Sequence, residues 1–172
     1  MPPRDAASAA RRAAPQEALP PEPIKDHLGL IAEMTRVFAA SHDARTVAAT
    51  ALERITLHVG AEAASLFLVT DDNETLVCTS CYGPVDITGL RIPSSSGIVG
   101  RAVSRQEGQI IRDVRNGADF GSAVDTKTGF TTRSIVVTPL SVGRDQLGAI
   151  EIINKASGDG LFSPDDQIGR AH

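Results

Sequence analysis

Two apolar segments near the end of the chain constrain its fold most. They cover residues 134–140 and 147–153, and a turn at residues 143–145 joins them. Both have the length of a strand and are far shorter than the roughly twenty residues that a membrane span requires. A connection of so few residues favours antiparallel pairing. The sequence therefore predicts a hairpin of two buried strands.

Glu151 is the anomaly in the second of these strands. Side chains alternate across a strand, so Glu151 shares one face with Ala149 and Ile153, and the other face is apolar too. Removing an ionised carboxylate from water costs several kcal/mol unless hydrogen bonds or a counter-charge replace its hydration. Two interpretations are open: a solvated acid on an edge strand, or a buried acid whose partner is a ligand.

Length and composition predict one soluble domain. The 172 residues are 41% hydrophobic and 22% charged, which is enough apolar material for one substantial core. The formal net charge is −4, and no basic cluster occurs outside the N-terminal tail. Nucleic acid and membrane are therefore not expected as partners.

Residues 1–23 are predicted to be a disordered tail, and residues 24–172 the folded domain. The tail is rich in Ala, Pro and Arg and has almost no large apolar side chain, so burial cannot offset the entropy lost on ordering. Its Arg- and Ala-rich start faintly resembles an organelle transit peptide, but it lacks the apolar core of a secretory signal. We predict a cytoplasmic location.

Two amphipathic helices are predicted to open the domain. Asp43 is suited to cap the second helix, which turns Leu52 and Ile55 inward. Apolar residues at helical spacing mark the first helix; they are Ile24, Leu28, Ile31, Met34 or Thr35, and Phe38.

The middle of the chain predicts further strands. Residues 64–70 and 75–81 flank a turn and indicate an antiparallel hairpin. Short extended pieces follow at residues 90–93 and 109–112, with a helix between them that Ser95 or Ser96 would cap.

A polar, Gly-containing stretch separates these strands from the C-terminal hairpin. Residues 116–130 predict a loop with one helical turn. A last helix is expected to start near residues 163–166 and to be cut short, because six residues remain after Asp166.

Cysteines and histidines give no sign of catalysis or metal binding. Cys78 and Cys81 have C-x-x-C spacing inside a predicted strand, where side chains alternate between faces, so we interpret them as structural thiols. No metal-ligand spacing links the histidines, which are His27, His42, His58 and His172.

Two other patterns are suited to a small polar ligand. Thr128 and Thr132 stand four residues apart, which in a helical turn would place two hydroxyls on one face. Residues 96–99 place free backbone N–H groups at a helix start, where the helix dipole favours an anion such as a phosphate. The alternatives are local backbone hydrogen bonding by the threonines and ordinary helix capping.

The same residues carry a family resemblance. DTKTGFTTRS at residues 125–134 and LGAIEIINK at residues 147–155 resemble segments of GAF domains that bind cyclic nucleotides. A signature of that branch is an Asn-Lys pair followed by a Phe and an Asp-Glu pair. Gln167 replaces its final Glu, and the matching residues are Asn154, Lys155, Phe162 and Asp166. The resemblance covers about residues 24–172.

The resemblance implies an α/β (α+β) sandwich. Its antiparallel sheet would have five or six strands, with the first two helices and the truncated last helix on one face. A lid would close a ligand pocket on the other face. In this signature Lys155 and Asp166 are expected to form an ion pair across a loop that Phe162 anchors, a structural role rather than a ligand contact.

The resemblance also implies the site. Thr128, Thr132 and Glu151 match pocket-lining residues, and Glu151 would accept N–H groups of guanine or the amine of adenine. The implied ligand-binding residues are Ile98 and Val99 near the phosphate, Asp125, Thr128, Thr132 and Glu151, and Cys81 or Tyr82 at the place of an aromatic that stacks on the purine.

Regulatory binding is the function that follows. We expect a sensor domain that binds cGMP or cAMP, needs no cofactor or metal, forms a homodimer and controls an attached phosphodiesterase, cyclase or kinase domain. The alternative is a ligand-free GAF module for dimerisation or docking. Catalysis as a free sulfoxide reductase also occurs among GAF proteins, but it uses several cysteines around the pocket.

Overall fold

The structure is a computed structural model that describes residues 22–41, 43–114 and 123–162. In the order of the chain, its elements are α1 (Glu22–Ala40), α2 (Ala44–Val59), β1 (Ala61–Val69), β2 (Thr75–Tyr82), β3 (Arg91–Pro93), α3 (Gly97–Arg105), β4 (Gln109–Ile111), α4 (Ala123–Thr128), β5 (Ile135–Val142) and β6 (Asp145–Lys155).

The strands form one antiparallel six-stranded sheet with the order β3-β2-β1-β6-β5-β4. This confirms the predicted fold class and both predicted hairpins. The apolar C-terminal hairpin is β5–β6, and β6 also pairs with β1. Because β6 has a neighbour on each side, it is a central strand. Glu151 is therefore not an edge-strand acid, and that interpretation is wrong.

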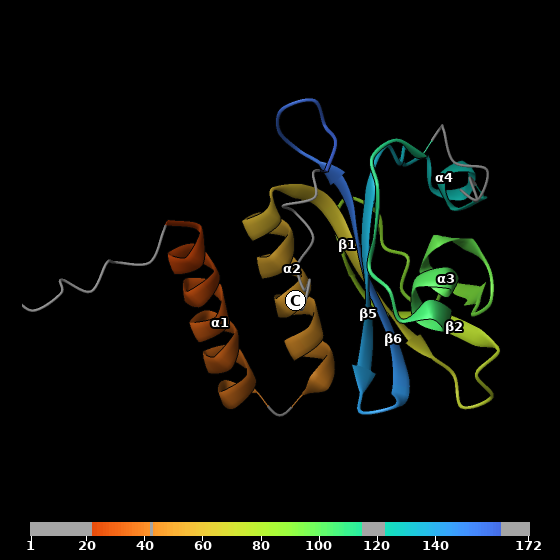
Figure 1. Ribbon diagram of the computed structural model, residues 1–172, viewed down its shortest axis with the longest axis horizontal. Coiled ribbons are helices and arrows are strands. Elements are labelled where there is room, and N and C mark those ends of the chain that lie inside the picture. The colour runs from red at the N-terminus through yellow and green to blue at the C-terminus, as the bar shows by residue number, and fades with distance from the viewer. Residues whose placement is uncertain (1–21, 42, 115–122, 163–172) are drawn as a thin grey trace, which may run out of the picture.

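Helices cover both faces of the sheet (Figure 1). On one face, α2 buries Leu52 against β-strand residues that include Ile152. On the other face, α3 buries Val99 and Val103 against a second cluster that includes Val137. Alternation along β6 divides its side chains between these two clusters, as the sequence pattern predicted.

Asp43 begins α2 as predicted. Its carboxylate accepts hydrogen bonds from the backbone N–H groups of Arg45 and Thr46, both at 3.2 Å. These bonds satisfy two of the amides that a helix start leaves without an intrahelical acceptor. Ser96 occupies the corresponding position of α3, but its side chain makes no capping hydrogen bond.

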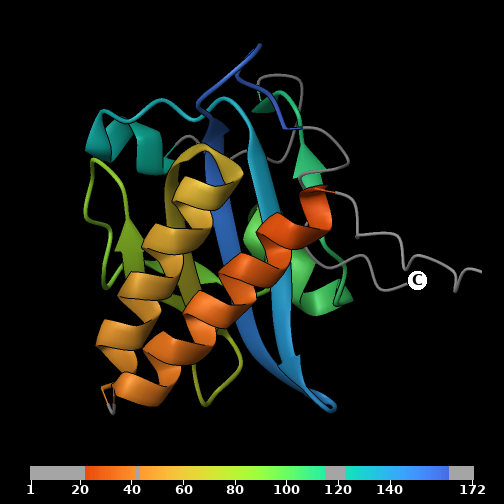
Figure 2. The same ribbon diagram turned by 90° about the vertical axis from the view of Figure 1, so that its left-hand side faces the viewer.

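The helix α1 forms an outer layer. It packs on α2, which lies between α1 and the sheet in Figure 1, and it is the helix nearest the viewer when the molecule is turned to show that side (Figure 2). As a result, the apolar stripe of α1 is not buried: Leu28, Ile31 and Phe38 are 54%, 60% and 54% exposed. Among the described residues, no helix combines the length and apolar character needed to cross a membrane.

Some of the predictions concern residues that the structure does not describe. Most of the predicted tail, the final helix and Asp166 lie outside the described residues. The described part of the domain starts at Glu22, two residues before the predicted boundary.

A β-bulge in β2 corrects the expectation for the cysteines. Leu66 of β1 pairs with Ser80, and the next residue, Phe67, pairs with Cys78. Thr79 is thus an extra residue, and a bulge of this kind resets the alternation of faces. Cys78 and Cys81 consequently pack against the same cluster, on the α3 side of the sheet. The expectation of simple alternation through this strand was wrong.

Candidate ligand-binding pocket

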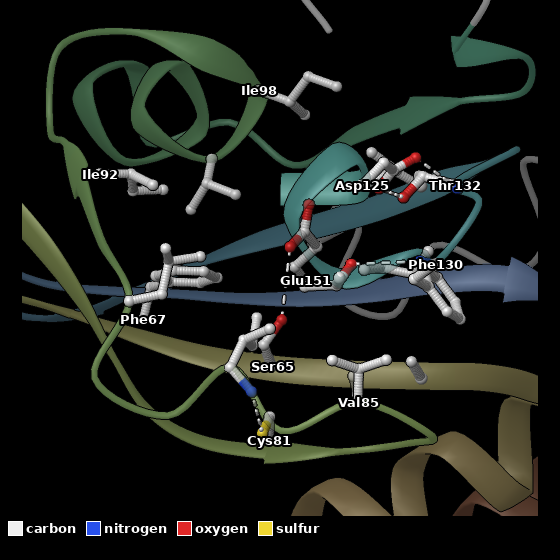
Figure 3. Close-up of a pocket in the computed structure, with 18 of the residues that line it drawn as sticks. Ser65, Phe67, Cys81, Val85, Ile92, Ile98, Asp125, Phe130, Thr132 and Glu151 are labelled. Carbon is white, nitrogen blue, oxygen red and sulfur yellow. Dashed lines mark hydrogen bonds between the residues drawn. The ribbon is translucent and has the colours of Figure 1, made fainter. Parts of the chain in front are cut away.

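A cavity of about 370 Å³ lies on the α3 side of the sheet. Its walls come from β1, β2, β3, α3, α4, β5 and β6 (Figure 3). The volume lies within the range of small-molecule pockets. All eight residues that the resemblance implied line this one cavity: Cys81, Tyr82, Ile98, Val99, Asp125, Thr128, Thr132 and Glu151.

Glu151 projects from the central strand β6 into the cavity (Figure 3). Its neighbours in the sheet are Ser65 on β1 and Val137 on β5. Ser65 donates a long hydrogen bond of 3.4 Å to Glu151 Oε2. The residue is half-buried because its open side faces the cavity. A single long bond from the described residues leaves acceptor capacity on this carboxyl for a ligand.

The electrostatics of the pocket disfavour a charged Glu151. Burial raises the pKa of Glu151 from 4.5 to about 7, against the effect of the Ser65 hydrogen bond, and the charge of Asp125 raises it further. The cavity offers no compensating cation, because no Lys, Arg or His occurs among the described residues that line it. The site therefore holds the Glu151 proton more tightly than an exposed glutamate in water would.

This proton makes stability depend on pH. The folded protein binds it more tightly than the unfolded chain, so its contribution is complete below pH 4.5 and is lost as pH rises through about 7. At about 1.4 kcal/mol per pKa unit, the total loss is on the order of 3 kcal/mol. Urea unfolding from pH 4.5 to 8 should show Glu151→Gln gaining stability relative to wild type as pH rises. A constant difference between the two proteins would contradict the shift.

Asp125 and Thr132 are partners of one another. The Asp125 carboxylate accepts hydrogen bonds of 2.7 Å from both the backbone N–H and the hydroxyl of Thr132. These bonds tie α4 to the segment that enters β5. The predicted helical stack of Thr128 and Thr132 does not form, because α4 ends at Thr128. Both threonines still line the cavity.

The start of α3 forms another wall. Gly97, Ile98 and Val99 are in its first turn and line the cavity, and the side chains of Ile98 and Val99 are buried. The N–H groups of a first helical turn have no intrahelical acceptors, and the helix dipole gives them a partial positive charge. The described residues bring no basic side chain to the cavity, so this turn is the described element best suited to an anionic group.

The bulge in β2 gives Cys81 and Tyr82 different surroundings, although both line the cavity. Cys81 packs toward the cavity-side cluster, whereas Tyr82 packs against the cluster under α2. Cys81 Sγ accepts a hydrogen bond from the Ile87 N–H at 3.4 Å. Phe130, at the exit of α4, lines the cavity and is an aromatic side chain that the sequence analysis did not select (Figure 3). It lies two residues after the end of α4, and this position was the available signal.

The signature residue Asn154 organises the end of the lid. Its Oδ1 accepts from the N–H groups of Arg133 and Ser134, at 2.7 and 3.3 Å. Its Nδ2 donates to Glu62 Oε2 at 2.8 Å and to the Thr131 carbonyl at 2.9 Å. Asn154 thereby fixes the chain next to Thr132, a role that the sequence did not disclose.

Glu62 and Lys155 complete the network around Asn154. Arg133 donates to Glu62 Oε1 at 2.6 Å. Burial opposes ionisation of Glu62, but the hydrogen bonds from Arg133 and Asn154 outweigh it and lower the pKa of Glu62. Lys155 Nζ donates to the Val59 carbonyl at 2.7 Å and lies 6.0 Å from the centre of the buried Phe162 ring. The predicted ion pair of Lys155 with Asp166 involves a residue outside the described part.

Metal binding has no support in the described part of the chain, where no group of three or more His, Cys, Asp or Glu could hold an ion. The fold and the cavity beside α3 and α4 have the organisation that the resemblance implied. A family model described as "GAF domain" matches residues 41–168, about three-quarters of the chain. The chain belongs to the GAF family.

Sequence relatives of this GAF domain include phosphodiesterases. It is 32% identical over 120 residues to a probable 3',5'-cyclic phosphodiesterase of Caenorhabditis elegans, an alignment that covers 63% of this chain and 16% of the relative. It is 28% identical over 124 residues to a dual 3',5'-cyclic-AMP and -GMP phosphodiesterase of Takifugu rubripes. This alignment covers 66% of this chain and 14% of the relative. The chain thus spans about a sixth of these curated relatives.

Solved GAF structures share the fold. The GAF domain of a phosphoenolpyruvate-protein phosphotransferase from Coxiella burnetii superimposes with a TM-score of 0.73 at 18% identity, over 83% of this chain and 84% of that one. A free methionine-R-sulfoxide reductase from Neisseria meningitidis, solved with its substrate, superimposes with a TM-score of 0.68 at 21% identity. This superposition covers 84% of this chain and 82% of that one. At these identities the likeness concerns the fold alone.

Proposed function

We propose that this GAF domain is a sensor that binds a cyclic nucleotide and regulates an attached signalling domain. The observation that carries the proposal is Glu151: a carboxyl on a central strand, with one long hydrogen bond, facing a cavity of about 370 Å³. The similarity to cyclic-nucleotide phosphodiesterases supports this choice of ligand class.

The ligand is proposed to bind across the cavity. Its phosphate meets the backbone N–H groups at Ile98 and Val99, where the helix dipole compensates one negative charge. Its base reaches Glu151, and the aromatic ring of Phe130 is available for stacking. Ligand contacts order the lid and shift the population of domain states toward the one that the output domain reads.

Calorimetric titration with cAMP and cGMP tests the proposal. Glu151→Ala should lower affinity by roughly 10- to 100-fold, the range expected for losing a hydrogen bond to a charged or buried group. Its stability near pH 8 should not fall, because the acid itself is unfavourable there. Glu107→Ala, which removes an exposed acid after the C-terminal end of α3, is the matched control. No heat of binding to either nucleotide by the folded wild type would refute the proposal.

Binding without chemistry is the simpler role for this pocket. Burial, and next the neighbouring Cys81, raise the pKa of Cys78 to about 12, so Cys78 is a protonated thiol and a poor nucleophile. Reduction of a free sulfoxide uses several cysteines around the pocket, and of the two cysteines here only Cys81 is among the described residues that line the cavity. We therefore propose that the domain binds its ligand and does not reduce a sulfoxide as a structural relative does.

The exposed stripe of α1 supports the proposed homodimer. Leu28, Ile31 and Phe38 are separated by three and seven residues, the spacing of core positions in a two-helix interface. Ile31→Lys should therefore lower the mass measured by sedimentation to that of a monomer, while Arg36→Lys, on an exposed polar position of the same helix, should not. Equal masses for wild type and Ile31→Lys would exclude this interface.

A further inference from the structure

Two carboxyl groups face one cavity, and they have unequal surroundings. Asp125 enters from α4 and uses both oxygens to accept 2.7 Å hydrogen bonds from Thr132. Glu151 enters from β6 with a single 3.4 Å bond from Ser65. Of the two carboxyl groups, Glu151 is therefore the one whose oxygens are least engaged by donors among the described residues.

The remaining groups around Glu151 do not stabilise a negative charge on it. From β2, the titratable neighbours are the thiols Cys78 and Cys81 and the phenol Tyr82, and from α4 it is Asp125. The described residues that line the cavity from β1, β3, α3 and β5 include no titratable side chain. Two influences favour the charged form, the long hydrogen bond from Ser65 and the positive end of the α3 dipole, and a bound phosphate would neutralise the second.

A neutral carboxylic acid presents a different hydrogen-bond pattern from a carboxylate. The acid has one O–H donor beside a carbonyl acceptor, whereas the carboxylate has acceptors only. The first pattern complements a ligand edge with an acceptor next to an N–H donor, such as N1 and the N6 amine of adenine. The second complements two adjacent donors, such as N1–H and N2–H of guanine.

We propose that Glu151 binds its ligand as the neutral acid, paired with a base edge that carries an acceptor beside an N–H donor, such as N1 and the N6 amine of cAMP. The inference rests on the proposed function and specifies its ligand. The acid donates its O–H to N1 and accepts one N–H of the amine, so two hydrogen bonds form without a buried charge. Guanine presents such an edge only at O6 and N1–H. Its pair of donors, N1–H and N2–H, would require Glu151 to release its proton to solvent and to carry a charge in an apolar cavity.

The experiment is calorimetric titration of the protein with cAMP and cGMP between pH 5.5 and 8.5. The affinity for cAMP should be constant at low pH and fall as Glu151 ionises, approaching about tenfold per pH unit. Glu151→Gln carries an amide donor beside a carbonyl and imitates the neutral acid. It should retain cAMP affinity within a few-fold of the low-pH wild type and lose the pH dependence. Glu107→Gln, at an exposed acid outside the cavity, should keep the wild-type profile.

The outcomes separate this inference from the proposed function. Binding of cGMP that is tighter than that of cAMP and strengthens with pH would overturn the inference and leave the nucleotide sensor intact. Loss of cAMP binding in Glu151→Gln would also overturn the inference and leave the sensor intact. A wild-type cAMP affinity that is independent of pH would have the same consequence. Failure of both nucleotides to bind the wild type at any pH would overturn both. Carbon-13 NMR of the Glu151 carboxyl in the unliganded protein gives a second check, since titration at an ordinary glutamate pKa would also overturn the inference.

Discussion

Gly148→Ala is expected to disrupt the centre of the sheet. Gly148 lies in β6 opposite Leu68 of β1, with φ of +152°. A Cβ at this position would stand 1.9 Å from the carbonyl oxygen of Phe67 and 2.9 Å from the Cα of Leu68. Backbone atoms cannot move aside as a flexible side chain can, so β1 and β6 must separate. We expect a loss of stability of about 3 kcal/mol or more.

Gly143→Ala provides the control for this prediction. Gly143 also has a positive φ, +62°, but a Cβ there would meet no atom within 4 Å. It lies in the turn between β5 and β6, so its replacement should cost only about 1 kcal/mol of backbone strain. Urea unfolding of the two variants measures the difference. Equal losses would show that the close approach of β1 does not control stability.

Asn154→Ala is expected to have the second largest effect. The Asn154 side chain is fully buried and makes four hydrogen bonds, three of them to the backbone of residues 131–134. Alanine would leave these backbone groups without partners, and each buried group left without a hydrogen bond costs about 1–3 kcal/mol. Alanine also tolerates the positive φ of 58° less well than asparagine does. We expect a loss of about 3–5 kcal/mol.

Asn73→Ala is the matched control for Asn154. Asn73 has nearly the same backbone conformation, with φ of +60°, but it is exposed in the turn between β1 and β2. Its replacement should cost about 1 kcal/mol, which isolates the contribution of the buried hydrogen bonds. Thermal unfolding would measure both variants. Because Thr132 borders the segment that Asn154 holds, the Asn154 variant should also bind ligand more weakly. Similar melting temperatures for the two variants would contradict this account.

The sequence pattern predicted the elements whose signals are local. Capping by Asp43 depends on amides two and three residues away, and the β5–β6 hairpin depends on a short turn between two apolar segments. The anomaly of Glu151 was visible for the same reason, because the alternation of side chains in a strand is fixed by its own backbone. The resemblance then selected residues that the structure gathers around one cavity.

The pairing of distant segments could not be predicted in this way. Whether β6 was an edge or a central strand depended on β1, about eighty residues earlier, and this pairing decided that Glu151 is enclosed. The bulge at Thr79 changed which face Cys81 occupies, and the interposed α2 left the stripe of α1 exposed.

The chain by itself determined its strands, its helix start at Asp43 and an acid in an apolar setting, because each follows from neighbours within a few residues. Only the tertiary structure decided what surrounds that acid. It brought Ser65 and Asp125 to Glu151 with no basic side chain among the described residues that line the cavity, and those contacts set its affinity for a proton. The physical reason is that burial and charge depend on distances in space, which strand pairing establishes across the whole chain.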